Sequence, residues 1–281
     1  MITPGQKIAV RIMFGIPWIV FAIQHYMYAD FVGMLVPAYM PLRVFWAYFT
    51  GTAMLAAGVS FIIGRQVQLA AFLLGCLMIL YLLMVHPTMI LPEPEGGKHW
   101  TRFFQDIAIM SSAFGLAIVS ERVDVGTVVQ NWGPDAASLR GWRAWLASPR
   151  ARVIVRYCYA LPFIILGAQH FTHNAFVTAK VPDWAPLLQF WDYVIGLALI
   201  AAVYGILFTS NQKRAKLLGK PVFRTSRWTA STLGIILTVL ALLQHVPLMV
   251  KNIHDPGEWT GLFLDIAVAA GAFIIAELAD R

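Results

Sequence analysis

Charged residues are scarce in this sequence. Only 12% of the 281 residues are charged, whereas soluble domains average about 25%. The sequence is also 59% hydrophobic, with a mean hydropathy of +0.69. These values exclude an ordinary soluble globular protein and predict an integral membrane protein whose first partner is the lipid bilayer.

Cysteines are few, and the common catalytic motifs are absent. Cys76 and Cys158 stand in apolar runs without a CxxC spacing, which argues against a disulfide framework. The sequence contains no GxSxG, P-loop, GxGxxG or CxxCH motif. A serine nucleophile, a bound nucleotide and c-type haem are therefore unsupported, and catalytic residues stay unassigned.

A tandem repeat organises the chain. Gln24-His25 recurs as Gln169-His170, and matched prolines, aromatic residues and glycines follow at the same offset of 145 residues. Later positions match at an offset of 159, so the second copy has 14 additional residues near 211–224. The later pairs are His86 and His245, Trp100 and Trp259, Thr101 and Thr260, and Asp106 and Asp265. Self-similarity at so long a period indicates a duplicated structural unit.

Eight stretches of the sequence are apolar and reach the length of about 20 residues that a bilayer-spanning helix needs. They run over 8–26, 43–63, 67–86, 101–119, 153–171, 188–208, 228–249 and 259–278. Four fall in each copy, and an even number gives both copies the same orientation. The sequence therefore predicts an all-α integral membrane protein, with eight transmembrane helices arranged as two parallel-repeat four-helix bundles.

The predicted domains follow the repeat. The first four-helix membrane repeat covers residues 1–120, a cytoplasmic linker covers 121–151, and the second four-helix repeat covers 152–281. The linker contains the stretch Gly141–Leu146, with two tryptophans and an arginine. This composition fits a short interfacial helix with tryptophan in the headgroup layer, and it fits a plain linker equally well.

Basic residues gather at one set of helix ends. Of the 21 lysines and arginines, 16 lie on the side of the two termini. The other side has Arg43, Lys98, Arg102, Lys180 and Lys251. The positive-inside rule then predicts a multi-pass protein of the plasma (inner) membrane with both termini in the cytoplasm. The net charge of +7 is explained by basic residues that set the membrane topology and contact anionic lipid. Nucleic acid is therefore not expected as a partner.

Polar residues retained in both copies are expected at one level, near the outer ends of the helices. Ionisable residues within membrane spans are costly and usually face the bundle interior, so each one is a functional hypothesis. The candidates for ligand or cofactor binding are Gln24, His25, His86 and Asp106 in the first copy, and Gln169, His170, His245 and Asp265 in the second.

Several kinds of chemistry fit this set. Histidine donors suit the carbonyl oxygens of a quinone, and an aspartate can orient a histidine or relay a proton. Histidine and carboxylate also bind metals or haem, but no HxxxH or HExxH spacing is present, so no metal ligand is assigned. A solute or proton path is a third reading. A structural network that caps helix ends is the alternative to all three.

A motif of phenylalanine, valine and proline follows the first helix of each copy. It reads FV-x3-VP-x-[YW]-x-P, and the first copy continues as FWAYFTGTAMLAAG. In Phe31–Gly58, and less clearly in Phe176–Ala202, the chain resembles the DoxX-like membrane protein family, as a tandem duplicate of the four-helix unit. The resemblance implies an inner-membrane protein with a redox or quinone connection and redox enzyme subunits as partners.

The chain departs from the family pattern on its second helix. Many family members carry a glutamate three residues after the glycine of a TG motif, and the two matching positions here are Met54 and Leu199. The expected function is a redox-associated membrane protein that binds a quinone or similar lipophilic ligand near the outer leaflet. The alternatives are a small-solute or proton-coupled transporter and a scaffold or assembly protein without chemistry.

Overall fold

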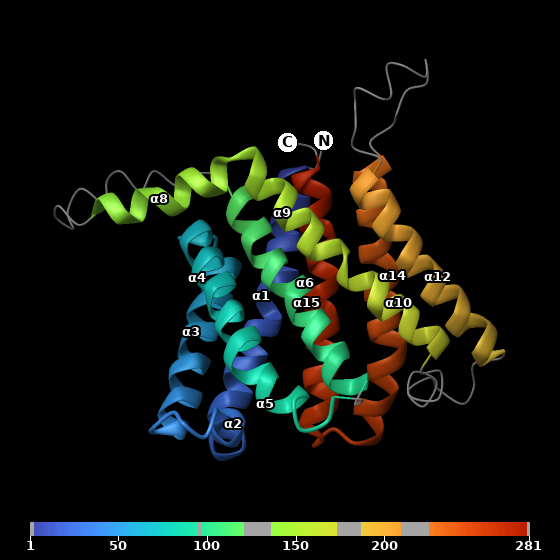
Figure 1. Ribbon diagram of the computed structural model, residues 1–281. Helices are drawn as coiled ribbons and strands as arrows, with labels where there is room; N and C mark the ends of the chain where they lie inside the picture. Colours follow the sequence, from blue (N-terminus) through green and yellow to red (C-terminus); the bar gives the residue numbers. More distant parts are fainter. Residues whose placement is uncertain (1–2, 95–96, 121–135, 173–186, 209–224, 280–281) are drawn as a thin grey trace.

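A computed structural model of the protein describes residues 3–94, 97–120, 136–172, 187–208 and 225–279. This part of the chain is helical and has no strand. Within it, eight spans are long and apolar enough to cross a membrane, which confirms the predicted all-α fold of two four-helix bundles (Figure 1).

The spans of the first copy are α1 (Pro4–Met27), α3 (Arg43–Ile63), α4 (Val67–Leu80) continued by η1 (Tyr81–Val85) and α5 (His86–Ile90), and α6 (Gly97–Val119). Those of the second copy are α9 (Pro149–Ala160) with α10 (Pro162–Thr172), α12 (Leu188–Phe208), α14 (Thr225–Lys251) and α15 (Pro256–Leu278).

Matched side chains fix where the first span of each copy begins. Thr3 accepts a hydrogen bond from the Gln6 backbone at 3.2 Å, and the Gln6 side chain accepts one from the Thr3 backbone at 2.9 Å. Ser148, at the position matching Thr3, accepts from the Ala151 backbone at 3.1 Å. These caps satisfy N–H groups that have no partner inside the helix.

Each copy enters its second helix through a leucine in left-handed backbone. Leu42 precedes α3 and Leu187 precedes α12, both with φ of 54°. A side chain at such an angle costs about 1 kcal/mol. Since Leu42 and Leu187 are matched positions, this strained turn is a property of the repeat.

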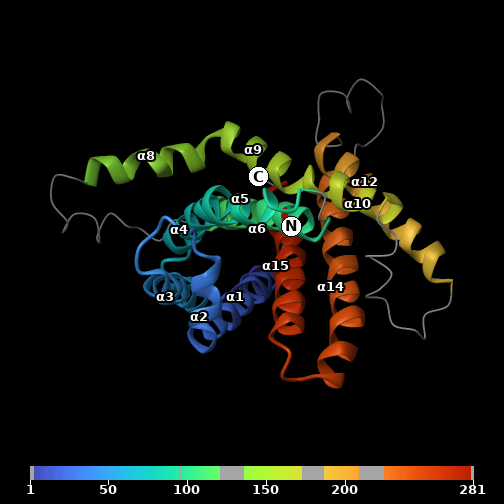
Figure 2. The same cartoon turned by 60° about the horizontal axis from the view of Figure 1, so that its bottom comes forward.

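The two copies pack through their first and fourth spans. Helices α6 and α15 lie against each other at the centre, α1 lies against α15, and α9 with α10 lies against α6 (Figures 1 and 2). The first span of each copy is thus placed on the fourth span of the other. The buried face of α15 is a run of small residues, Ala267, Ala269, Ala270 and Ala272, which lets helix backbones approach closely.

Matched glycines make room for the candidate histidines. A Cβ atom added at Gly51 would lie 2.8 Å from the His25 Cβ, and one added at Gly196 would lie 2.7 Å from the His170 Cβ. Real Cβ atoms do not approach so closely. Glycine is therefore needed on the second span of each copy for the histidine of the first span to lie against it.

A further helix, α8 (Ala136–Ala147), runs across the end of the bundle where the two termini lie (Figure 1). The Trp142 ring stacks on Phe72 at 4.5 Å, and Trp145 lies edge-on to Phe114 at 5.8 Å. Arg143 lies over the Trp142 ring at 5.2 Å. A helix is therefore present in the predicted linker. Its interfacial location and the domain boundaries stay predictions, and residues 121–135 and 211–224 lie outside the described part of the chain.

Candidate functional site

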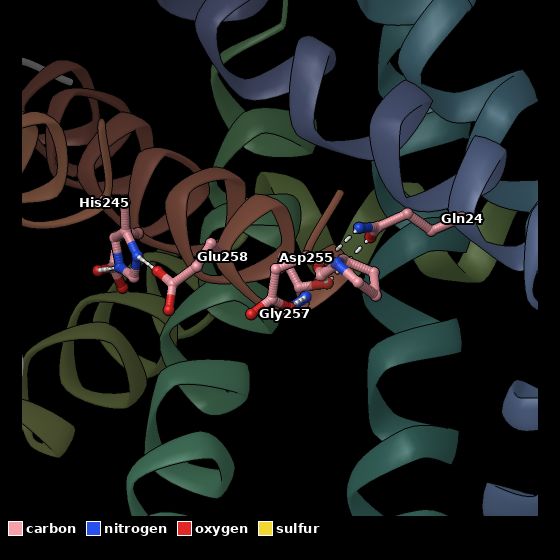
Figure 3. A network of polar contacts seen from close by, with 8 residues as sticks. Gln24, His245, Asp255, Gly257 and Glu258 are labelled. Carbon is pink, nitrogen blue, oxygen red and sulfur yellow. Dashed lines mark hydrogen bonds and ion pairs between the residues drawn. The ribbon is translucent and has the colours of Figure 1, made fainter. Parts of the chain in front are cut away.

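Gln24 and Gln169 join each copy to the fourth span of the other copy. Gln24 Nε2 donates to the Pro256 carbonyl at 3.0 Å, and Gln24 Oε1 accepts from the Thr260 hydroxyl at 3.1 Å. Figure 3 shows Gln24 reaching from α1 to the start of α15. In the other direction, Gln169 Oε1 accepts from the Thr101 hydroxyl at 2.8 Å.

These two contacts are equivalent by the repeat. Gln169 Nε2 also points to the Gly97 carbonyl at 3.5 Å, and Gly97 matches Pro256 just as Thr101 matches Thr260. The same donors and acceptors therefore recur around a pseudo-twofold axis between the copies. Both glutamines hold the N-terminal turn of a fourth span, at the helix ends that lie away from the described termini.

His86 and Asp106 form a buried pair in the first copy. His86 Nε2 lies 2.8 Å from Asp106 Oδ2, and both residues are buried. Arg102, one turn earlier on α6, brings its Nε to 3.9 Å from Asp106 Oδ1. The sequence predicted His86 and Asp106 as candidates, and the structure brings these two together across the third and fourth spans.

His245 lies between two carboxylates in the second copy. Its Nε2 is 3.2 Å from Asp265 Oδ2 and its Nδ1 is 2.9 Å from Glu258 Oε2 (Figure 3). Gln105 of α6 donates from Nε2 to Asp265 Oδ1 at 3.0 Å, so the first copy also contributes to this group. The Asp265 side chain is 27% exposed, compared with 12% for Asp106. We call His245, Glu258, Asp265 and Gln105 the α15 polar group.

The first-span histidines have different partners in the two copies. His25 Nδ1 lies 2.7 Å from the Phe21 carbonyl, which can only accept, so Nδ1 carries the proton. His25 Nε2 then accepts from the Tyr81 hydroxyl at 3.1 Å. His170 instead pairs through Nδ1 with the buried Asp192 carboxylate.

Four partners were not predicted from the sequence: Tyr81, Gln105, Asp192 and Glu258. Each occurs in one copy only, since the matching positions are Leu240, Leu264, Ala47 and His99. A search for polar residues retained in both copies cannot find them. The signal that remained was a polar or ionisable side chain within an apolar span or next to its end.

The candidate residues do not converge on one metal-binding point. Within the described ranges, no group of three or more His, Cys, Asp or Glu residues is placed to hold a metal ion. A hollow with a volume of about 610 Å³ lies between α1, α14 and α15. Ala9, Ile12, Leu242, Leu262 and Ile266 are among its lining residues, all of them apolar. A smaller hollow of about 310 Å³ lies between α3 and α4.

Gly261 leaves the space that the His245 ring occupies. A Cβ atom there would lie 2.4 Å from His245 Cε1. Gly261→Ala is therefore expected to displace the ring and to lower the free energy of unfolding by about 1 kcal/mol. Equilibrium unfolding in detergent micelles measures this. Arg102→Ala is the matched control, because it removes only a partly exposed contact of 3.9 Å to Asp106. It should lower the free energy of unfolding by less than Gly261→Ala does. Equal losses would contradict the steric role of Gly261.

No family model, no curated protein and no solved structure matches the sequence. The length and hydropathy of the eight spans decide the class of protein. It is a polytopic membrane protein. The resemblance to the DoxX-like family rests on the sequence motifs alone.

Proposed function

We propose that this membrane protein binds a quinone or similar lipophilic molecule near the outer leaflet, as a redox-associated, DoxX-like accessory protein that works beside redox enzyme subunits. The observation that supports the proposal is the apolar hollow between α1, α14 and α15, because two of the helices that line it, α14 and α15, also carry His245 and Asp265. Leu242 precedes His245 by three residues, Leu262 precedes Asp265 by three, and Ile266 follows Asp265 directly.

The size and lining of the hollow suit such a ligand. Small-molecule sites are typically about 300 to 1,000 Å³, mostly apolar, with a few polar groups that orient the ligand. At about 610 Å³ and lined by apolar side chains, the hollow suits a hydrocarbon tail.

A scaffold role is the second candidate, and the contacts of the first copy favour it. His86 is satisfied by Asp106, and His25 by Phe21 and Tyr81, so these side chains already have protein partners. Gln24 joins the copies. In this second reading the retained polar residues stabilise the pairing of the two bundles without a ligand.

The proposal includes an orientation. The start of α1, the turn between α3 and α4, and α8 with the start of α9 lie on the side of the described termini (Figure 1). These segments carry Arg11, Arg65, Arg143 and Arg152. By the positive-inside rule, this side faces the cytoplasm of a cell whose inner membrane holds the protein. The α15 polar group then lies toward the outer leaflet.

Native mass spectrometry of protein extracted in mild detergent tests the proposal. We expect a lipophilic molecule bound to the chain and released on activation. Ala9→Phe fills the larger hollow and should abolish binding, since Ala9 is an exposed lining residue whose enlargement leaves the core intact. Ala56→Phe in the smaller hollow is the matched control and should retain the ligand. A bare polypeptide mass for the wild-type protein would support the scaffold instead.

A further inference from the structure

We propose that the hollow between α3 and α4 holds one acyl chain of an anionic phospholipid, whose phosphate is bound by Arg11 and Arg65 at the turn that joins the two helices. This site is separate from the hollow between α1, α14 and α15, and it does not rest on the proposed function. We call it the α3–α4 lipid site.

The hollow between α3 and α4 is apolar and open to the outside of the bundle. Its volume is about 310 Å³, and its lining consists of small side chains on α3 and mainly leucines on α4. Two of the lining residues, Ala56 and Leu73, are exposed, so the hollow opens on a surface that a bilayer would cover. A helix with its side chains is about 10 to 12 Å across, which is too wide for such a space, whereas a single hydrocarbon chain fits it.

At the matching level of the second copy, the two spans are in direct contact. The positions that match Ser60 and Ala70 of the hollow are Gly205 and Thr229. A Cβ atom added at Gly205 would lie 2.4 Å from Thr229 Oγ1, so Thr229 already fills the space beside this glycine. The room between α3 and α4 at this level is therefore a feature of the first copy and does not follow from the repeated fold.

Two arginines lie at the turn between α3 and α4. Arg65 belongs to the turn and is exposed. The Arg11 guanidinium reaches the turn from α1, because a Cβ atom added at Gly64 would lie 2.8 Å from Arg11 Nη2. Gly64 stands between Ser60 and Gln66, and both of these line the hollow. A phosphate bound by the two arginines would therefore lie at the end of the hollow.

The guanidinium of Arg11 is less well satisfied than that of its match, Arg156. The Nε atom of each is buried without a hydrogen-bond partner. However, Arg156 Nη2 donates to the Ile206 carbonyl and to the Ser226 hydroxyl. The position that matches Ser226 is Val67, which has no hydroxyl to offer Arg11. The first copy therefore leaves a donor for an external acceptor where the second copy uses it internally.

Charge at the turn favours an anionic partner. Among the described residues, the ion pairs of lysine and arginine join Lys7 to Glu277 and Arg102 to Asp106, and neither Arg11 nor Arg65 has a carboxylate partner. Arginine has five N–H donors in a planar fork that matches phosphate, and such charge-assisted hydrogen bonds are about twice as strong as neutral ones.

A phospholipid has both of the required parts, a phosphate for the arginines and a hydrocarbon chain for the hollow. An anionic headgroup is preferred, because the ammonium group of a zwitterionic headgroup would be repelled by the two guanidinium groups. The turn lies at the end of the bundle where α8 runs (Figure 1). The tryptophans and arginine of α8 are typical of a helix at the headgroup layer, which is the level that the phosphate of a bound lipid would occupy.

Native mass spectrometry of the full-length protein in detergent, titrated with lipid, tests the α3–α4 lipid site. The probes are phosphatidylglycerol and phosphatidylcholine with identical acyl chains. We expect one phosphatidylglycerol per chain with a Kd about tenfold lower than that of phosphatidylcholine, because one hydrogen bond to a charged group changes affinity by this factor. Arg65→Gln and Arg11→Gln should each remove most of this preference. Ala56→Phe fills the hollow from an exposed position and should weaken the binding of both lipids.

A matched variant and a soluble competitor keep the result interpretable. Arg43→Gln makes the same change of charge at the opposite end of α3 and should leave the preference unchanged. Glycerol phosphate, which lacks acyl chains, should not displace the lipid at equal concentration, and displacement would overturn the proposal in favour of a soluble anion. Equal affinity for the two lipids, or a preference that survives in both arginine variants, would also overturn it. A dimer that Ala56→Phe dissociates would assign the hollow to a second copy of the chain instead.

Discussion

Replacing Asp106 by leucine is expected to lower the free energy of unfolding by about 3 kcal/mol, the largest single effect among the variants considered. His86 is 4% exposed and its Nε2 bonds to Asp106 at 2.8 Å. Removal of one partner from a buried ionisable pair leaves the other buried without compensation, which is costly in an apolar medium. Unfolding of the purified protein in mixed micelles, followed by circular dichroism, measures the loss.

A second substitution shows whether the loss comes from the pair. Adding His86→Leu to Asp106→Leu removes the remaining polar group and should restore most of the stability, because replacement of both partners by apolar groups is often neutral. The interaction energy follows from the double-mutant cycle. If the double variant is less stable than Asp106→Leu alone, His86 has a stabilising role that does not depend on Asp106.

Replacing both Gln24 and Gln169 by alanine is expected to lower the free energy of unfolding by about 2 kcal/mol. Together the two side chains make four hydrogen bonds to the fourth spans, and interhelical hydrogen bonds in membranes contribute about 0.6 kcal/mol each on average. Each single variant should show about half of the loss. Unfolding in mixed micelles again provides the measurement.

A glutamine whose partner, within the described residues, stands on its own helix provides the control for the paired bonds. Gln189 donates to the Tyr193 hydroxyl at 3.4 Å within α12, and Gln189→Ala should change stability by less than either single variant. If Gln24→Ala lowers the free energy of unfolding and Gln169→Ala does not, the two contacts share a geometry but do not contribute equally to stability.

The sequence allowed the architecture to be predicted because lipid imposes simple requirements. A bilayer demands long apolar segments with every backbone group satisfied internally, so hydropathy identifies the spans. The predicted stretch 43–63 coincides with α3, and 188–208 with α12. Helix α8 is longer than the motif Gly141–Leu146 that suggested it. The packing of α1 on α15 was not predicted, because hydropathy says which segments enter the membrane and not which ones meet.

The candidate site was predictable only where both copies use the same residue. The His86–Asp106 and His245–Asp265 pairs unite retained residues that the sequence had already singled out. Glu258 was missed because His99 stands at its matching position. Gln24 was predicted as a ligand residue, and the structure shows it bonded to α15. Its role toward a ligand stays a prediction, because a retained amide fits a contact between copies as well as a binding site.

The contact between α1 and α15 has a consequence for biosynthesis. Gln24 lies 232 residues before Pro256 and 236 before Thr260. At the usual pace of synthesis, α1 enters the membrane on the order of 10 to 50 s before these partners exist. Until then the Gln24 amide has nothing on α15 to bond, and the α1 surface that α15 later covers faces lipid or the insertion machinery. The first bundle therefore completes its assembly only when the final span of the second has been inserted, and a chain released early exposes a polar face within the bilayer.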